Sequence, residues 1–240
     1  MRVASWTLAA VASFSALGGF IFGYDLGLIG GALLGLSVDL GIHDSISQSS
    51  IVGALKLGSF VGAFVGGALM LRYGRRKAIA MCSLFAMLGP LVMASSSGVG
   101  GLVAGRAISG IGVGACAIIV PAYLAEVAPA SHRGAVVQVY EMMLCVGLLV
   151  STLVNWGLSH LGPFAWRVMV GLPAIPGGLL AGSLLLLPES PRWLVMQGHL
   201  DLALQTIHTV LGGKKSPFPG VFGQDPAEIA QAEDELLLLC

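Results

Sequence analysis

Six apolar runs, each long enough to cross a lipid bilayer, constrain the fold of this chain more than any other feature of its sequence. A membrane helix needs about 20 mostly apolar residues. The six runs are Trp6–Leu36, Ile46–Leu71, Ala78–Ala94, Gly101–Ala125, Ala135–His160 and Phe164–Leu187. Charged residues make up only 10% of the chain, against about 25% in soluble domains. The sequence therefore predicts an all-α, polytopic membrane protein with six transmembrane helices.

Two of these helices are expected to be irregular, and several to pack closely. The first run is longer than a bilayer is thick, which favours a tilted or bent helix. Pro173 and Pro176 are expected to kink the sixth. Glycines recur at four-residue spacing at positions 27, 31 and 35, at 58, 62 and 66, and at 110 and 114. Small residues let helix backbones approach closely in lipid.

Lysine and arginine are unevenly distributed among the connecting segments, and this predicts the orientation. Arg72, Arg75, Arg76 and Lys77 lie between the second and third runs, whereas the first and third connections hold no basic residue. Basic loops face the cytoplasm, so both ends of the chain are expected there. The net charge of zero gives no nucleic-acid footprint. We expect a multi-pass protein of the plasma membrane or of an internal membrane.

Apart from Arg167 at the start of the sixth run, four charged residues interrupt the apolar runs. Counted along their helices, Asp25 lies about 18 Å and Arg106 about 12 Å from the outer membrane face. These compatible depths predict an ion pair, either purely stabilising or switching as the carboxylate takes up a proton. Lys56, at a similar depth, could compete for Asp25 or extend its ammonium outward. Glu141, about 10 Å from the inner face, could contact a polyhydroxylated solute or pack as a polar residue.

The chain changes character after the sixth run, so we expect a transmembrane unit over residues 1–187 and a cytoplasmic helical segment over 188–240. Apolar residues at helical spacing predict a short amphipathic helix at His199–Leu211. Asp225, Pro226 and Glu228 form a typical helix start. The leucine run that follows stops at Cys240, which suggests truncation before a seventh transmembrane helix.

Five short motifs in this order give the chain its resemblance to a known family. They are Gly23-Tyr24-Asp25, the stretch GALMLRYGRRK over 67–77, Gly105-Arg106, Glu126 with Arg133-Gly134, and PESPRWL over 188–194. Over about residues 10–210, the sequence resembles the sugar porter family of the major facilitator superfamily. The resemblance implies the N-terminal half of a fold with two six-helix halves, each half built from inverted three-helix repeats.

The resemblance also implies roles for individual residues. Asp25 and Arg106 match a proton-coupling pair. Phe22, Glu141, Leu144 and Leu148 match positions that contact the sugar or line its pocket, although glutamine is usual at the position of Glu141. A cytoplasmic latch that holds the two halves together is expected from Gly74, Arg75, Arg76, Glu126, Arg133, Glu189 and Arg192. Leu71 replaces the aspartate of the family motif, which should weaken one contact of this latch.

The function implied is transport of a monosaccharide, a hexose or a related polyol, by alternating access, with or without a proton. Two alternatives remain open: a truncated half that acts only by association with another half, and a sugar-sensing membrane protein. No enzymatic activity is expected, because no nucleophile–base pair or phosphate loop is found. The glycine-rich run near Arg106 lacks the preceding strand of a dinucleotide site. Expected partners are the sugar, protons, the lipid bilayer and a missing C-terminal half; no cofactor or metal is expected.

Overall fold

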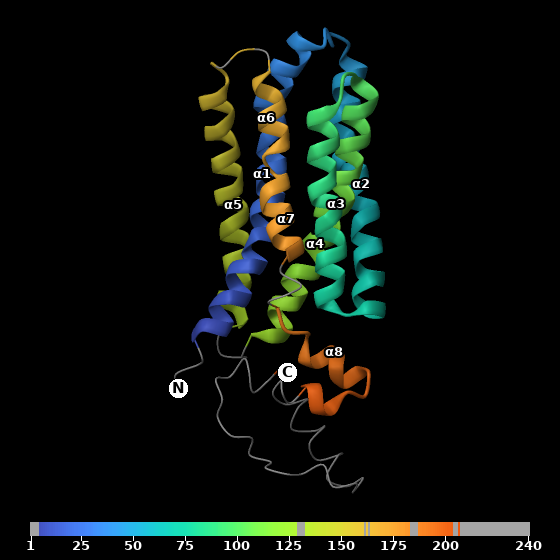
Figure 1. The fold of residues 1–240 in the computed structure, drawn as a ribbon, viewed down its shortest axis with the longest axis vertical. Helices are drawn as coiled ribbons and strands as arrows, with labels where there is room; N and C mark the ends of the chain where they lie inside the picture. The colour runs from blue at the N-terminus through green and yellow to red at the C-terminus, as the bar shows by residue number, and fades with distance from the viewer. Residues whose placement is uncertain are drawn as a thin grey trace, which may run out of the picture.

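The described part of the chain is a bundle of helices. A computed structural model describes residues 5–128, 133–160, 162, 164–182, 187–203 and 206. The helices in these ranges are α1 (Ser5–Asp39), α2 (Ser45–Tyr73), α3 (Arg75–Ser95), α4 (Val99–Val127), α5 (Arg133–Leu158), α6 (Ala165–Gly171), α7 (Ala174–Gly182) and α8 (Pro191–Met196). In Figure 1, α1–α5 run along the long axis, and α6 and α7 follow one another along the same axis. α8 lies beyond one end of the bundle.

The helices agree with the predicted membrane spans, except that the sixth span is divided. Among the described residues, five helices, α1 to α5, are long and apolar enough to cross a membrane. In the sixth run, residues 164–182 instead form α6 and α7, separated by a turn at Leu172 and Pro173. Proline has no backbone N–H to continue the helical hydrogen bonds, and the irregularity expected at Pro173 is present as a break between α6 and α7. At Pro176, where a kink was also expected, α7 continues without a break.

The glycine ladders hold helices in backbone contact, as predicted. Side chains added at Gly58 and Gly62 of α2 would overlap the backbone of Ala107 and Ile111 in α4. On the other side of the bundle, a side chain at Gly23 of α1 would overlap the backbone of α5. Small residues favour such close contacts in lipid. These contacts bring α2 against α4 and α1 against α5 along their lengths.

These two close pairings support the inverted repeats that the resemblance implies. If α1–α3 and α4–α7 are two copies of one repeat, α1 corresponds to α4 and α2 corresponds to α5. The contact of α1 with α5 is then equivalent to the contact of α4 with α2. Inverted three-helix repeats require this exchange. α3, α6 and α7 complete the bundle, with α3 packed against both α6 and α7.

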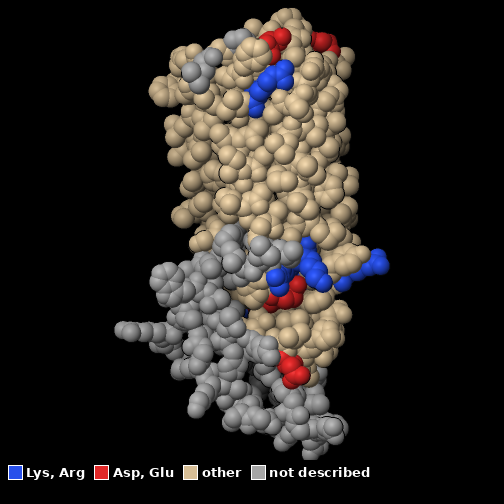
Figure 2. All heavy atoms as spheres, in the orientation of Figure 1, with Lys and Arg blue, Asp and Glu red and all other residues tan. Residues whose placement is uncertain are grey.

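On one face of the bundle, charged residues gather at the two ends (Figure 2). On the face shown in Figure 2, a wide band without acidic or basic residues separates charged groups at the top from those at the bottom. The bottom end carries Arg72, Arg75, Arg76 and Lys77, and we call it the basic end. A transmembrane protein requires such an uncharged band over the hydrocarbon core of the bilayer.

At the opposite end, polar side chains tie three helices together. Trp166 donates a hydrogen bond from Nε1 to Oδ2 of Asp39 at 2.8 Å. Arg167 donates from one guanidinium nitrogen to the carbonyl oxygens of Ala94 and Ser96, at 3.0 and 2.7 Å. These bonds satisfy carbonyls at the C-terminal end of α3 that have no partner within the helix. They fix α6 against α1 and α3.

The expected segment over residues 188–240 is described only in part. It begins with α8, whose N-cap Ser190 accepts a hydrogen bond from the backbone N–H of Trp193 at 3.4 Å. The amphipathic helix predicted at His199–Leu211 is described through residue 203 and at residue 206, with helical geometry at residues 200–203. The helix predicted from Asp225 lies outside the described residues.

Candidate functional site

Asp25 of α1 and Arg106 of α4 form an ion pair in the interior of the bundle. Oδ1 of Asp25 lies 3.8 Å from a guanidinium nitrogen of Arg106, and each residue is only 1% exposed. The same guanidinium nitrogen lies 3.5 Å from the backbone oxygen of Asp25. The contact expected from the depths of the two charges along their helices is therefore present.

Ser109 completes this pair and is not among the site residues expected from the sequence. Its hydroxyl donates a hydrogen bond to Oδ2 of Asp25 at 2.7 Å, and the residue is fully buried. Ser109 follows Arg106 by three residues, and side chains three apart share a helix face. This spacing is the signal that could have identified it.

The hydrogen-bonding capacity of the Asp25–Arg106 pair is only partly satisfied. Oδ1 of Asp25 and the Nε and Nη2 atoms of Arg106 are buried without a hydrogen-bond partner. A buried charge without full hydrogen bonding is costly. One oxygen of the carboxylate is thus anchored by Ser109, whereas the other faces Arg106 at more than hydrogen-bond distance. Oδ1 of Asp25 can accept a proton, and the loss of its negative charge would then free the Arg106 guanidinium from the ion pair.

The four residues expected to contact a sugar belong to α1 and α5, and two of them lie at the contact between these helices. Gly23 packs against the backbone of Leu144, and Gly27 lies against the side chain of Leu148. Glu141 and Leu148 are exposed, whereas Phe22 and Leu144 are half-buried. Neighbouring contacts place Glu141 at the level of α1 residues 19–23, about 6 Å nearer the basic end than Asp25.

At the basic end, two carboxylates join three segments of the chain. Glu126 of α4 pairs with the guanidinium of Arg75 at 2.8 Å and accepts a hydrogen bond from the Ser190 hydroxyl at 2.6 Å. Oε1 of Glu189 accepts hydrogen bonds from the backbone N–H groups of Arg75 and Arg76, at 2.8 and 3.0 Å. Glu189 therefore caps the first turn of α3, where an anion is favoured.

The other expected latch residues differ in their placement. Gly74 has φ +89°, a conformation that side chains rarely adopt, and an added Cβ there would also contact the Glu189 carboxylate. Arg192 is exposed on α8, and Arg133 begins α5. The structure thus joins Gly74, Arg75, Arg76, Glu126 and Glu189, whereas it leaves Arg192 at the surface.

Leu71 contacts α8 through its backbone rather than through its side chain. Its side chain is 57% exposed, while its carbonyl oxygen accepts a hydrogen bond from Nε1 of Trp193 at 3.2 Å. This bond does not depend on the side chain at residue 71. The bond between α2 and α8 therefore forms with leucine at residue 71, and the weakening of the latch expected from this residue stays a prediction.

Lys56 is exposed on α2, whereas Asp25 is buried and paired with Arg106. The structure therefore does not place Lys56 as a partner of Asp25.

Replacing Glu189 with alanine tests the capping role of its carboxylate. We expect Glu189→Ala to lower the free energy of unfolding by about 0.5–2 kcal/mol, because the first N–H groups of α3 lose their acceptor. Glu189→Gln keeps a side-chain oxygen that can accept these hydrogen bonds, so it should lower stability less than Glu189→Ala. Unfolding of the purified protein in detergent, followed by circular dichroism, measures both. Equal effects of the two substitutions would contradict the capping role.

The comparisons with known proteins agree on the kind of protein. The family model "Sugar (and other) transporter" matches residues 11–222. The chain is 37% identical to plastidic glucose transporter 4 of Arabidopsis thaliana, over 88% of the chain and 39% of that protein. It is 38% identical to the human proton myo-inositol cotransporter, over 85% of the chain and 31% of that protein.

A solved structure of the xylose transporter XylE from E. coli, in a partially occluded inward-open conformation, has the same fold. The TM-score is 0.77 at 27% sequence identity, with 98% of this chain and 57% of that chain covered. The described bundle therefore corresponds to the N-terminal part of a major facilitator transporter. The chain spans about two fifths or less of the length of the two curated relatives.

Proposed function

This chain belongs to the sugar transporter family, and on that premise we propose that it forms the N-terminal half of a transporter that moves a monosaccharide, a hexose or a related polyol, by alternating access. The observation that carries the proposal is the pairing of Asp25 with Arg106 beside the contact of α1 with α5. The relatives named for glucose and myo-inositol support a polyhydroxylated substrate. In such a transporter, two halves rock about a central site, so a second six-helix half is required.

In this proposal, the basic end faces the cytoplasm, and so do both ends of the chain. Basic residues flanking membrane spans are retained on the cytoplasmic side, and the basic end carries four of them between α2 and α3. The opposite end, where Trp166 and Arg167 tie α6 to α1 and α3, then faces outward. The central site opens to each side in turn.

The sugar binds where α1 meets α5. Phe22, Leu144 and Leu148 supply apolar contacts to one face of the sugar ring. Glu141, exposed at the same level, accepts hydrogen bonds from sugar hydroxyls, and bonds to a charged acceptor are stronger than neutral ones. Because a carboxylate accepts but does not donate, Glu141 favours substrates that present hydroxyl donors at this position.

Asp25 couples the movement of the sugar to a proton. A proton on Oδ1 neutralises the carboxylate and weakens its attraction to Arg106, which then becomes free for another partner. Intramembrane carboxylates in proton relays commonly serve this purpose. The incomplete hydrogen bonding of the pair supports such a switch, because a fully satisfied pair would resist it. The network of Glu126, Glu189 and Arg75 acts separately, as one side of a latch that closes the cytoplasmic end.

Replacing Asp25 with asparagine tests the coupling. In proteoliposomes that hold the protein at its natural length, an inward proton gradient should drive accumulation of D-xylose, D-glucose or myo-inositol. If one proton accompanies each sugar, each pH unit supplies about tenfold accumulation. Asp25→Asn should abolish accumulation but retain exchange of labelled for unlabelled sugar, because asparagine cannot carry the proton.

Asp44→Asn is the matched control. Asp44 caps α2 through Ser47 at the opposite end of the bundle, and asparagine caps equally well, so the gradient dependence should be unchanged. Unaltered proton dependence in Asp25→Asn would overturn the coupling. Absence of saturable flux for all three sugars in the native protein would overturn the transport function itself.

A further inference from the structure

Lys56 is a charged residue that the proposed transport cycle does not use. It lies eleven residues after the first residue of α2, about 16 Å along the helix. Its side chain is exposed within a helix long and apolar enough to span the membrane. Ionisable residues at such positions usually face water or a partner rather than lipid tails.

The surroundings of Lys56 are polar on one side. A hollow of ≈ 360 Å³ between α1 and α2 is lined by Leu33, Gln48, Ser49, Val52, Gly53 and Lys56. The amide of Gln48 is held in place by a hydrogen bond from Nε2 to the carbonyl oxygen of Ile42 at 3.0 Å. The hollow is open to the surface and is lined by an ammonium, an amide and a hydroxyl.

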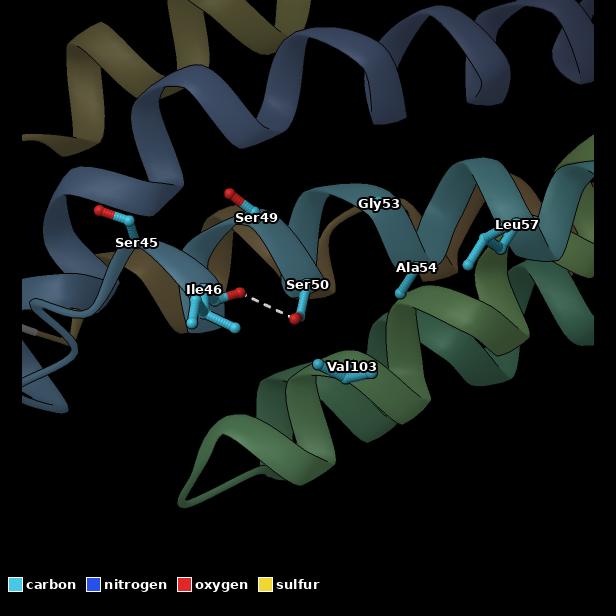
Figure 3. Close-up of a pocket in the computed structure, with 8 residues that line it drawn as sticks. All are labelled: Ser45, Ile46, Ser49, Ser50, Gly53, Ala54, Leu57 and Val103. Carbon is cyan, nitrogen blue, oxygen red and sulfur yellow. Dashed lines mark hydrogen bonds between the residues drawn. The ribbon is translucent and has the colours of Figure 1, made fainter.

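A second hollow, of ≈ 570 Å³, adjoins the first and lies between α2 and α4. The two share Ser49 and Gly53. In Figure 3, Ser49 and Ser50 point to different sides of α2, and Val103 of α4 points toward α2. Ser50 donates its hydroxyl to the carbonyl oxygen of Ile46 at 2.8 Å and lines only the second hollow. Ser49 is the serine that lines both hollows.

The positive charge of the Lys56 hollow is not balanced by the described part of the chain. Within the described ranges, no acidic side chain forms an ion pair with Lys56. The carboxylates in the outward half of the bundle bind elsewhere: Asp25 to Arg106, Asp39 to Trp166 and Asp44 to Ser47. The hollow therefore has a single uncompensated positive charge, which matches a ligand with a single negative charge.

We propose that this hollow binds the carboxylate of an acidic monosaccharide, of the hexuronic acid class, at the outward mouth of the transporter. The inference rests on the proposed function, because it takes the ligand to be a sugar. The ammonium of Lys56 binds the carboxylate, and Gln48 and Ser49 bind ring hydroxyls. One lysine matches the single charge of a carboxylate better than the double charge of a phosphate ester.

Charge also separates this site from the central sugar site. The Lys56 hollow is bounded by Leu33 of α1, whereas Glu141 lies at the level of α1 residues 19–23. Along α1 this difference is about 15–20 Å. A sugar carboxylate is attracted at Lys56 and repelled at Glu141, so the acidic sugar stays at the outward mouth and obstructs the entry of neutral sugars.

Equilibrium binding of labelled D-glucuronate and D-glucose to the reconstituted protein, at its natural length, tests the site. We expect Lys56→Gln to weaken D-glucuronate binding at least tenfold and to leave D-glucose binding unchanged, while Lys56→Arg retains both. Lys77→Gln, which removes an exposed lysine at the basic end, should retain both as well. D-Glucuronate should also inhibit D-glucose uptake in the native protein and not in Lys56→Gln.

Two outcomes would overturn the inference. One is equal D-glucuronate binding by the native protein and Lys56→Gln. The other is no D-glucuronate binding at all while D-glucose still binds, which would assign Lys56 to a carboxylate side chain of another segment or to a lipid phosphate. Absence of binding of D-glucose, D-xylose and myo-inositol alike by the native protein would instead count against the proposed transport function, so the two failures are distinguishable.

Discussion

Arg106→Gln is expected to lower the free energy of unfolding by about 3–5 kcal/mol, because it leaves the Asp25 carboxylate buried without its countercharge. Asp25 is 1% exposed, and Ser109 would remain as the donor to one of its oxygens. The carboxylate cannot reach water to recover the lost interaction. Unfolding of the purified protein in mixed detergent micelles, monitored by circular dichroism, measures the loss.

The double variant Asp25→Asn with Arg106→Gln provides the control. Removing both charges eliminates the uncompensated carboxylate, so the double variant should be more stable than Arg106→Gln alone. The difference from additivity gives the coupling between the two residues. If Arg106→Gln costs less than about 1 kcal/mol, or if the two substitutions are additive, the ion pair at 3.8 Å does not stabilise the bundle.

The second large effect is expected at Gly66, where α2 packs against α4. A Cβ built on Gly66 would lie 2.8 Å from both Cα and Cβ of Ala115, closer than side chains pack. Gly66→Leu must therefore separate two helices that touch through their backbones. We expect a loss at or above the upper end of the 1–3 kcal/mol that is typical of overpacking, measured by the same unfolding experiment.

The adjacent glycine is a matched control. A Cβ at Gly67 meets nothing within 4 Å, so Gly67→Leu adds the same side chain, one residue later, into open space. It should change stability by less than about 0.5 kcal/mol, as surface substitutions usually do. If Gly66→Leu and Gly67→Leu unfold alike, the close contact of α2 and α4 does not depend on the glycine ladder.

Membrane spans and the central charge pair could be predicted from the sequence for the same physical reason. A bilayer excludes unpaired backbone groups and isolated charges, so apolar runs must be helices of a set length. That length also gives the depth of each charge. Asp25 and Arg106 followed from depth alone, and their contact at 3.8 Å agrees with this prediction. The chemistry of proline predicted an irregularity of the sixth helix at Pro173 and Pro176, but not that the helix would break only at Pro173.

The hydrogen bonds of Glu189 and Leu71 depend on contacts between segments far apart in the sequence. Local sequence patterns do not predict such contacts. Glu189 caps α3 across 114 residues of sequence, and the exposed Leu71 contributes its carbonyl rather than its side chain to Trp193. A sequence shows which groups are polar but not which carbonyls and N–H groups lack partners after packing.

The sequence by itself determined that this chain is a helical membrane protein with a charge pair at matched depths, because the bilayer acts on each segment separately. Only the tertiary structure decided how those charges are held. It placed the Ser109 hydroxyl on Asp25 and left Lys56 exposed beside a hollow with polar and apolar lining, rather than paired with Asp25. Depth along a helix follows from counting residues, whereas the direction in which a side chain faces depends on which helices pack beside it.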